Sequence, residues 1–547
     1  MEFNPIIPET RLRSMREAGH WPDRLIIDWH DEAAARSPDK VALVDHNSTT
    51  GVSTTISFRQ LNRLSKRIAL GLTALGVGRS DVVSMQLPNW WEFVAVHLAC
   101  VRIGAVTNPL MPIFRARELR FMLDLAETKV AIVPQTFRGF DYPAMYAELR
   151  ADLPKLGTVL VVKGDGDGSF EKALIDRRWE DELDAEAVFA ANRPGPNDVI
   201  ELCYTSGTTG EPKGAMHTSN TLISTLGSFI RRAGLGPDTV AFMASPLAHQ
   251  SAFLYGMLVS QILGTKLVLQ DVWNPESAAR IIQDEGATFT MGATPFLADL
   301  ADTPAVEKYD VSTLRTFVSA GAPIPRVLVE RATQRLGCFV HSGWGMTENG
   351  YVTGTGIGDP PEKVFGTDGY PLEGMEVRVV GEGGQPLPAG EEGRLQAKGA
   401  SNFVGYLKRP ERFDTDEEGW FETGDLARMD EDGYIRITGR AKDLIIRGGE
   451  NIPIVEVEEL LYRHPAVQDA AIVAMPDPRL GERACAFVTL KPGERLSFEQ
   501  MIGYLERHRM ARQYLPERLE IVEEMPRTPS GKIQKFRLRE RAAELQS

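Results

Sequence analysis

Short apolar runs alternate with amphipathic helical patterns along the first 130 residues of the chain. Val41–Val44 and Val130–Val133 are two such runs, each bounded by turn-forming or polar residues. Between them, Ser57 and Gln60 have the spacing of a capping box, which predicts that a helix begins there. Strands alternating with helices are typical of parallel sheets covered by helices. Because the rhythm resumes over residues 196–316, we predict an α/β fold with two parallel-type sheets.

The pattern changes in the last third of the chain. Short strands and glycine-rich turns follow Gly366 and predict a β-rich subdomain over about residues 366–440. The remaining residues combine short strands with helical patterns, one of them begun by a capping box at Ser497, and form a compact α+β unit of domain size. We therefore expect an N-terminal domain over 1–440 and a small C-terminal domain over 441–547.

Composition excludes several classes of function. The 547 residues include 61 basic and 75 acidic side chains, a formal net charge of −14, which disfavours nucleic-acid binding and attachment to anionic membranes. The four cysteines form no CxxC pair, so neither a zinc knuckle nor a redox dithiol is predicted. Charged residues interrupt the most apolar stretch, Trp90–Leu110, so we expect no membrane span. No signal peptide is recognisable, and we expect a cytoplasmic protein.

Thr205–Gly214, with the sequence TSGTTGEPKG, is the most informative segment. It follows an apolar strand, Val199–Tyr204, and contains three glycines, four hydroxyl side chains and Lys213. Such a loop presents N–H and O–H donors and a positive charge to phosphate oxygens. Neither a Walker A loop nor a dinucleotide fingerprint can be fitted to it. From composition alone, a solvated surface loop is an equal alternative.

Four further segments follow in the order typical of one family. They are Gly343–Glu348 (GWGMTE), Thr423–Asp425 (TGD), Gly439–Asp443 (GRAKD) leading into Arg447–Asn451, and Pro526–Lys532 (PRTPSGK). With the Thr205–Gly214 loop, they resemble the signature motifs of the adenylate-forming (ANL) superfamily. This superfamily contains acyl-CoA synthetases, luciferases and the adenylation domains of peptide synthetases.

The resemblance implies a two-step reaction that uses ATP, Mg²⁺ and CoA. A carboxylate attacks the α-phosphate of ATP to give an acyl-adenylate and pyrophosphate, and a thiol then displaces AMP. The resemblance implies catalytic roles for Lys532, Thr205, Glu348 and His249, with Glu348 as the Mg²⁺ ligand. Lys532 would bridge the substrate carboxylate and the α-phosphate. The residues implied in ATP or AMP binding are Thr205, Ser206, Gly207, Thr208, Thr209, Gly210, Lys213, Gly321, Ala322, Pro323, Trp344, Gly345, Met346, Thr347, Asp425 and Arg440.

The resemblance also implies a mobile C-terminal domain. Lys532 serves the first step, whereas Arg447, Gly448 and Gly449 resemble the CoA-binding loop of the second, so the domain is expected to rotate between steps. The implied hinge is Lys442. Similar ligases are switched off by acetylation of the catalytic lysine, which suggests an acetyltransferase and a deacetylase as partners acting on Lys532.

The acyl pocket is implied around His249, Phe253, Met291 and Phe296. No Arg or Lys stands in these stretches to pair a second carboxylate, which favours an apolar monocarboxylic acid. Ordinary core packing is the alternative for each of these residues.

Within the superfamily, the chain looks most like bacterial short- and medium-chain acyl-CoA synthetases, including cyclohexanecarboxylate–CoA ligases. We therefore expect cyclohexanecarboxylate or a similar alicyclic or medium-chain acid as the substrate. The alternatives are a general short- and medium-chain fatty acyl-CoA synthetase, a stand-alone adenylation protein that loads a carrier protein, a luciferase-like oxidase and a nucleotide- or acyl-binding sensor.

Overall fold

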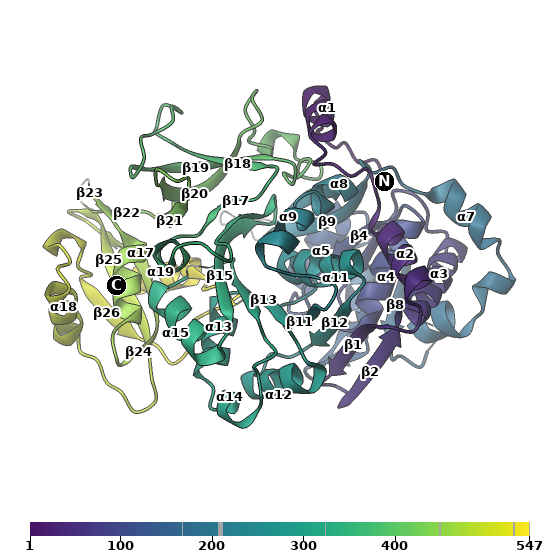
Figure 1. The fold of residues 1–547 in the computed structure, drawn as a ribbon, viewed down its shortest axis with the longest axis horizontal. Helices are drawn as coiled ribbons and strands as arrows, with labels where there is room; N and C mark the ends of the chain where they lie inside the picture. The colour runs from purple at the N-terminus through teal and green to yellow at the C-terminus, as the bar shows by residue number, and fades with distance from the viewer. Residues whose placement is uncertain (167, 206–211, 323, 448–449, 529–530, 546–547) are drawn as a thin grey trace.

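The structure is a computed structural model that describes residues 1–547 except 167, 206–211, 323, 448–449, 529–530 and 546–547. Figure 1 shows two packed helix–sheet layers on the right, a β-rich subdomain above them and a smaller C-terminal domain on the left. This is the predicted α/β architecture with a β-rich subdomain and a small C-terminal domain.

A six-stranded sheet carries the Thr205–Gly214 loop. Its strands are parallel except for the edge strand β10, which pairs antiparallel with β9. In spatial order they are β10 (Lys213–Thr218), β9 (Val199–Thr205), β4 (Val106–Pro109), β3 (Val82–Met85), β5 (Val130–Pro134) and β8 (Thr158–Val162).

A nine-stranded sheet forms the second layer. Its central strands are parallel, and antiparallel strands close both edges. In spatial order they are β17 (Tyr370–Pro371), β16 (Gly350–Gly354), β15 (Phe339–Met346), β14 (Thr316–Ser319), β13 (Phe289–Gly292), β11 (Val240–Met243), β12 (Lys266–Gln270), β1 (Val41–Asn47) and β2 (Val52–Ser57).

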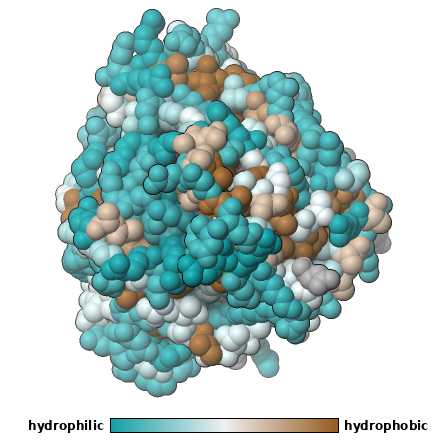
Figure 2. Space-filling model, turned by 90° about the vertical axis from the view of Figure 1, so that its right-hand side faces the viewer, coloured by the Kyte–Doolittle hydropathy of each residue, from teal (hydrophilic) through white to brown (hydrophobic). Residues whose placement is uncertain are grey.

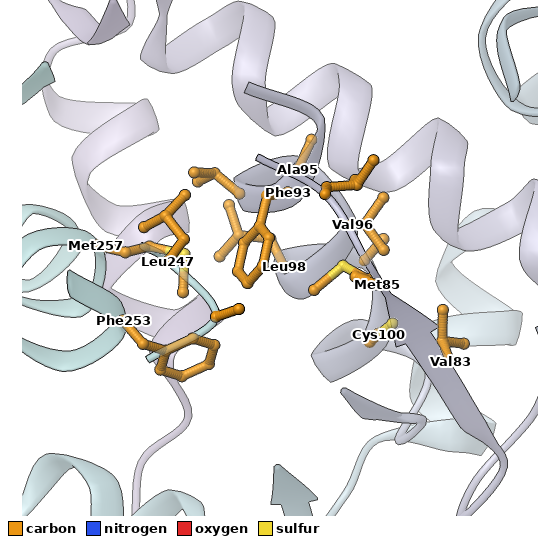
Figure 3. Packing of buried hydrophobic residues seen from close by; sticks show 14 of the residues in the cluster. Val83, Met85, Phe93, Ala95, Val96, Leu98, Cys100, Leu247, Phe253 and Met257 are labelled. Atoms are coloured by element: carbon orange, nitrogen blue, oxygen red, sulfur yellow. The ribbon is translucent and has the colours of Figure 1, made fainter. Parts of the chain in front are cut away.

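Helices cover these sheets and bury a shared core. The capping box is confirmed, because Gln60 Oε1 accepts from the Ser57 backbone N–H at 2.8 Å and the Ser57 hydroxyl caps the same helix. Figure 3 shows Phe93 and Phe253 from different helices facing each other within the apolar cluster. The helices are α1 (Glu9–Glu17), α2 (Ile26–Arg36), α3 (Phe58–Ala74), α4 (Trp91–Arg102), α5 (Ala116–Leu125), α6 (Tyr142–Arg150), α7 (Ala185–Asn192), α8 (Ser219–Ile223), α9 (Leu226–Arg232), α10 (Gln250–Ala252), η3 (Phe253–Leu258), α11 (Val259–Leu263), α12 (Pro275–Glu285), α13 (Thr294–Asp302), α14 (Ala305–Lys308), α15 (Arg326–Leu336) and α16 (Pro361–Gly366).

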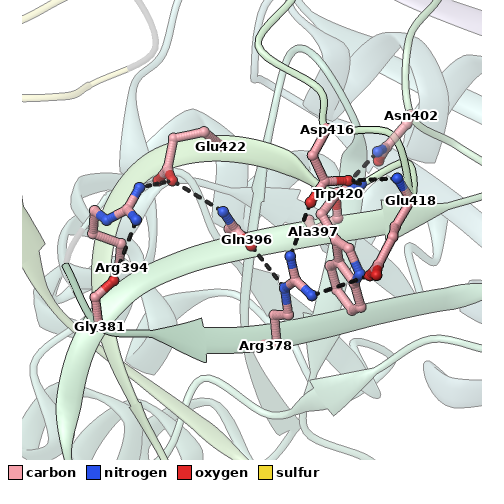
Figure 4. A network of polar contacts seen from close by, with 10 residues as sticks. All are labelled: Arg378, Gly381, Arg394, Gln396, Ala397, Asn402, Asp416, Glu418, Trp420 and Glu422. Carbon is pink, nitrogen blue, oxygen red and sulfur yellow. Dashed lines mark hydrogen bonds and ion pairs between the residues drawn. The ribbon is translucent and has the colours of Figure 1, made fainter. Parts of the chain in front are cut away.

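The β-rich subdomain is a four-stranded antiparallel sheet. Its strands are β18 (Met375–Val380), β19 (Glu392–Gly399), β20 (Phe421–Met429) and β21 (Ile435–Arg440). On one face, Gln396 links Arg378 to Glu422, as Figure 4 shows. The other face packs into an apolar cluster that includes Trp344.

The C-terminal domain has apolar clusters of its own. Helices pack on a five-stranded sheet, and the predicted capping box at Ser497 is confirmed at the start of α18. The elements are β22 (Ile445–Arg447), β23 (Glu450–Ile452), α17 (Ile454–Tyr462), β24 (Val467–Asp477), β25 (Gly481–Leu490), α18 (Phe498–Arg507), β26 (Arg518–Ile521) and α19 (Lys535–Glu544).

On the side of the molecule displayed in Figure 2, the described residues form no large continuous apolar patch. Figure 2 shows separate small hydrophobic patches among hydrophilic residues on the side that it displays. Among the described residues, no helix is both long and apolar enough to span a membrane.

Candidate active site

The strands β9 and β10 bring the two ends of the TSGTTGEPKG loop together. Thr205, the last residue of β9, pairs directly with Lys213, the first residue of β10. The Thr205 hydroxyl oxygen is buried and has no hydrogen-bond partner among the described residues, so it is available to a ligand. The predicted contacts Ser206, Gly207, Thr208, Thr209 and Gly210 lie outside the described residues.

Glu348 lies just beyond the end of β15 and beside this hairpin. Its Oε1 accepts a hydrogen bond of 2.6 Å from the hydroxyl of Tyr406, which in turn accepts one of 3.0 Å from Nζ of Lys213. Burial lowers the pKa of Lys213, and the charge of Glu348 opposes that shift. Sequence reasoning missed Tyr406, because the only signal for it was a tyrosine in an unremarkable loop.

The neighbouring Thr347 is held by its backbone. The carbonyl oxygen of Thr347 lies 2.8 Å from Nε2 of His217, whose pKa is lowered to about 4 by burial. At neutral pH the uncharged imidazole donates from Nε2, which holds the backbone of the GWGMTE segment in place at this residue. Met346, the last residue of β15, donates its N–H to the side chain of Asn349 at 3.2 Å.

Asp425 lies on β20 and is almost fully buried. Its Oδ1 lies 2.9 Å from Nε of Arg440, and its Oδ2 accepts a hydrogen bond of 2.8 Å from the indole N–H of Trp344. Both oxygens are thus oriented by the protein, yet each retains a lone pair that can accept from a sugar hydroxyl. Trp344 both packs in the core of the β-rich subdomain and lines the cavity described below.

Lys532 of the C-terminal domain faces this group. Its pKa is lowered to about 8, first by the positive charge of Arg440 and then by burial, while Asp425 acts in the opposite direction. The Lys532 backbone is fixed by reciprocal hydrogen bonds with Thr528. The lysine is therefore mainly protonated at neutral pH, but its charged form is favoured over the neutral amine by less than in an exposed lysine.

His249 directly precedes α10, and its pKa is affected by the charge of Lys532. Burial, and to a smaller extent the charge of Lys532, together lower the pKa of His249 to about 4. Its Nδ1 accepts a hydrogen bond from the Ser251 backbone N–H at 3.2 Å. The imidazole is therefore neutral at pH 7, and the Nε2 atom carries its proton.

A cavity of about 580 Å³ lies between the two domains. Its lining includes six of the predicted ATP- or AMP-binding residues together with Lys532. The six are Gly321, Ala322, Trp344, Gly345, Asp425 and Arg440. Pro323, predicted beside Ala322, lies outside the described residues. The structure therefore brings the predicted sugar-binding pair, the predicted adenine-binding segments and the predicted catalytic lysine around one cavity.

The residues around Glu348 fit a magnesium ion that is bound largely through a substrate. Within the described residues, Oε2 of Glu348 has no hydrogen-bond partner, and no group of three or more His, Cys, Asp or Glu side chains could hold a metal alone. Mg²⁺ typically takes one or two carboxylates together with phosphate oxygens and water. One oriented carboxylate beside a hairpin rich in donors meets that requirement.

The predicted acyl-pocket residues are distributed over several elements. Phe253 is fully buried and packs edge-on against His97 with ring centroids 4.7 Å apart, and Met291 lies in β13. Phe296 packs against Trp273, and a Cβ at Gly531 would lie 3.7 Å from its ring. Phe296 thus lies next to the turn that carries Lys532, while Phe253 also belongs to the core.

The predicted hinge residue and the predicted CoA-binding arginine contact other parts of the C-terminal domain. Lys442 is exposed, and its carbonyl oxygen accepts a hydrogen bond of 3.3 Å from Arg539 of α19. The side chain of Arg447 is bound within its own domain by Glu517 and two backbone carbonyls. Gly448 and Gly449 lie outside the described residues.

Comparisons with known proteins identify the class. Residues 30–407 match the AMP-binding enzyme family, and residues 456–532 match the AMP-binding enzyme C-terminal domain. The chain belongs to this family, which confirms the resemblance to the ANL superfamily. It is therefore an enzyme of the ATP-dependent acid ligase class.

Two relatives span nearly the whole chain. A medium-chain fatty-acid–CoA ligase of Escherichia coli (strain K12) is 37% identical over 97% of this chain and 93% of its own. A 2,3-dihydroxybenzoate–AMP ligase of Bacillus subtilis (strain 168) is 32% identical over 98% of this chain and 97% of its own.

The fold is also similar to that of MatB from Rhodopseudomonas palustris. The ATP-bound crystal structure superposes with a TM-score of 0.81 at 27% identity, over 93% of this chain and 97% of that chain. The apo structure of MatB superposes over the same fractions of both chains but with a lower TM-score of 0.71. The overall structure of this chain is thus more similar to the ATP-bound form of MatB than to the apo form.

Proposed function

We propose that the protein is an acid–CoA ligase that activates an apolar monocarboxylic acid as its adenylate and transfers the acyl group to CoA. The observation that carries the proposal is the position of Lys532, which lines the same cavity as Asp425 and Arg440. Its positive charge also contributes to the lowered pKa of His249. The full-length similarity to a medium-chain fatty-acid–CoA ligase supports it.

The first step requires two anions to approach each other. The acid carboxylate attacks the α-phosphorus, and the bond to the bridging oxygen breaks as pyrophosphate leaves. Lys532 offsets the negative charge of both reactants, while Thr205 and Lys213 donate to phosphate oxygens. Asp425 and Arg440 hold the ribose, which fixes the α-phosphate in front of Lys532. Mg²⁺ held by Glu348 would neutralise charge on the leaving phosphates.

His249 is suited to a neutral role beside Lys532. Because its pKa is about 4, it does not add a second positive charge that would repel the lysine. Its Nε2–H can donate to a carboxylate oxygen of the acid. His249 would therefore orient the attacking carboxylate rather than exchange a proton with it.

The second step requires a different arrangement of the C-terminal domain. The thiol of CoA attacks the acyl carbonyl carbon and loses its proton, and AMP leaves with the electrons of the acyl–oxygen bond. Rotation about Lys442 would withdraw Lys532 and bring Arg447 and its glycine loop to the cavity. The different TM-scores against ATP-bound and apo MatB support two arrangements in this family.

Cyclohexanecarboxylate or a similar alicyclic or medium-chain acid is the proposed substrate. Phe253, Met291 and Phe296 are buried apolar side chains that would form the walls of the acyl pocket. Discrimination by such walls amounts to only about 1–3 kcal/mol per methylene, so neighbouring acids should also react. A general medium-chain fatty-acid substrate is the second candidate, favoured by the similarity to the medium-chain fatty-acid–CoA ligase of E. coli.

Adenylation without CoA is a candidate of another class. The similarity to a 2,3-dihydroxybenzoate–AMP ligase favours it, because that relative is named for the adenylate alone. In that case the acyl group would pass to a carrier protein.

Regulation by acetylation of Lys532 is part of the proposal, with an acetyltransferase and a deacetylase as partners in the cytoplasm. Acetylation would remove the positive charge that faces Asp425, so adenylation should stop. Unchanged activity after quantitative acetylation at Lys532 would reject this form of control.

ATP–pyrophosphate exchange over a panel of acids tests the proposed activity. The panel should contain cyclohexanecarboxylate, benzoate, hexanoate, octanoate, salicylate and malonate. We expect exchange with the alicyclic and medium-chain acids, and little with malonate. Exchange with none of the acids would reject the substrate class. Exchange with an acid that yields no thioester with CoA would favour loading of a carrier protein.

A further inference from the structure

Tyr406 lies between two oppositely charged groups beside the TSGTTGEPKG loop. Its hydroxyl donates to Oε1 of Glu348 at 2.6 Å and accepts from Nζ of Lys213 at 3.0 Å. The ammonium also lies over the tyrosine ring, 4.2 Å from its centroid. Within the described residues, no direct ion pair joins Lys213 to Glu348, so the hydroxyl separates the two charges.

The protein holds this hydroxyl in place without a ligand. Tyr406 is 3% exposed, its backbone forms a bridge with Ala215 of β10, and its ring packs against Phe403 with centroids 4.7 Å apart. Phe403 in turn donates its backbone N–H to the carbonyl of Glu348 at 2.7 Å. The same short segment therefore fixes both the backbone and the side chain of Glu348.

We propose that Tyr406 is a positioning residue for the metal-binding carboxylate. It occupies Oε1 of Glu348 and leaves Oε2 for the Mg²⁺ that accompanies ATP. It also prevents the Lys213 ammonium from pairing with Glu348 directly. A direct ion pair would occupy both the Lys213 ammonium, which is to bind phosphate, and the Glu348 carboxylate, which is to bind the metal. The metal–nucleotide complex would then have to break that ion pair in order to bind. The inference rests on the proposed role of Glu348 as the Mg²⁺ ligand.

Equilibrium binding of Mn²⁺–ATP, followed by electron paramagnetic resonance without any acid, tests this role. Tyr406→Phe retains the ring and its contact with Lys213 but removes the hydroxyl. A hydrogen bond to a charged group is worth about a factor of ten in an equilibrium constant, so we expect about tenfold weaker binding. Tyr142→Phe is the matched control, because it removes a buried hydroxyl that donates to the Pro112 carbonyl at 2.7 Å. It should bind Mn²⁺–ATP like the wild type.

A double-mutant cycle separates positioning from a general structural effect. If Tyr406 acts through Glu348, Tyr406→Phe should weaken Mn²⁺–ATP binding in the wild type but not in a Glu348→Gln background. Equal losses in both backgrounds, or wild-type binding by Tyr406→Phe, would overturn the inference. Because the assay contains no acid, it can succeed even if the proposed ligase activity fails. Wild-type binding by Glu348→Gln would overturn both the metal role and the inference.

Discussion

Replacing Arg440 by glutamine should raise the pKa of Lys532. Arg440 is the largest cause of the lowered pKa of that lysine, ahead of burial, whereas Asp425 and Glu348 act in the opposite direction. The fall from an ordinary value of 10.5 to about 8 corresponds to about 3 kcal/mol against the charged form, at about 1.4 kcal/mol per pH unit. Without the guanidinium, the pKa should return part of the way toward 10.5.

The sign of the pH dependence follows from the charge that adenylation requires. Lys532 is protonated below a pH of about 8 and neutral above it, so kcat/KM for ATP should fall as pH rises through that value. In Arg440→Gln, the fall should begin at higher pH, even though loss of the sugar contact lowers the rate at every pH. The position of the alkaline limb is therefore the informative quantity.

The assay is ATP–pyrophosphate exchange at subsaturating ATP from pH 6.5 to 10. Arg59→Gln serves as the control, because Arg59 is an exposed arginine that pairs with Asp39 on the surface. The alkaline limb of the pH profile of Arg59→Gln should coincide with that of the wild type. An Arg440→Gln limb that does not move, measured with enzyme that still activates acid, would refute the electrostatic reasoning.

Three further substitutions test other parts of the account. Lys532→Ala should reduce ATP–pyrophosphate exchange by about 10²–10³-fold with an unchanged circular dichroism spectrum, and a loss below tenfold would contradict its role. Lys442→Pro should impair thioester formation from preformed acyl-adenylate more than adenylation, whereas equal losses in single-turnover assays would count against a hinge. Ser497→Ala should lower the unfolding free energy of the C-terminal domain by about 1 kcal/mol in a urea titration, since it removes the cap of α18, and an unchanged midpoint would show that the cap contributes nothing.

Local sequence signals predicted the fold well because they depend on neighbouring residues. The capping box at Ser57 and Gln60 and the strand before Thr205 are decided within a few positions of the chain. The pairing of β1 with β12 was not predictable in this way, because it joins residues more than 200 positions apart. Such pairings depend on which apolar surfaces meet in the folded core.

The site was predictable only where its motifs are contiguous. Asp425, Arg440 and Lys532 could be proposed from short segments, and the structure places them around one cavity. The Tyr406 hydroxyl could not be proposed, because its partners Lys213 and Glu348 come from two other segments. The packing of Phe253 in the core against His97 is likewise a property of the fold that no local pattern records.

Direct detection of the acyl product by mass spectrometry tests the central claim most directly. The enzyme would be incubated with ATP, Mg²⁺, CoA and cyclohexanecarboxylate or octanoate, and both the acyl-adenylate and the acyl-CoA would be quantified against AMP. We expect acyl-CoA in equal amount to AMP with at least one of these acids, and product formation about 10²–10³-fold slower with Lys532→Ala. Accumulation of acyl-adenylate with no thioester in the presence of CoA would contradict it.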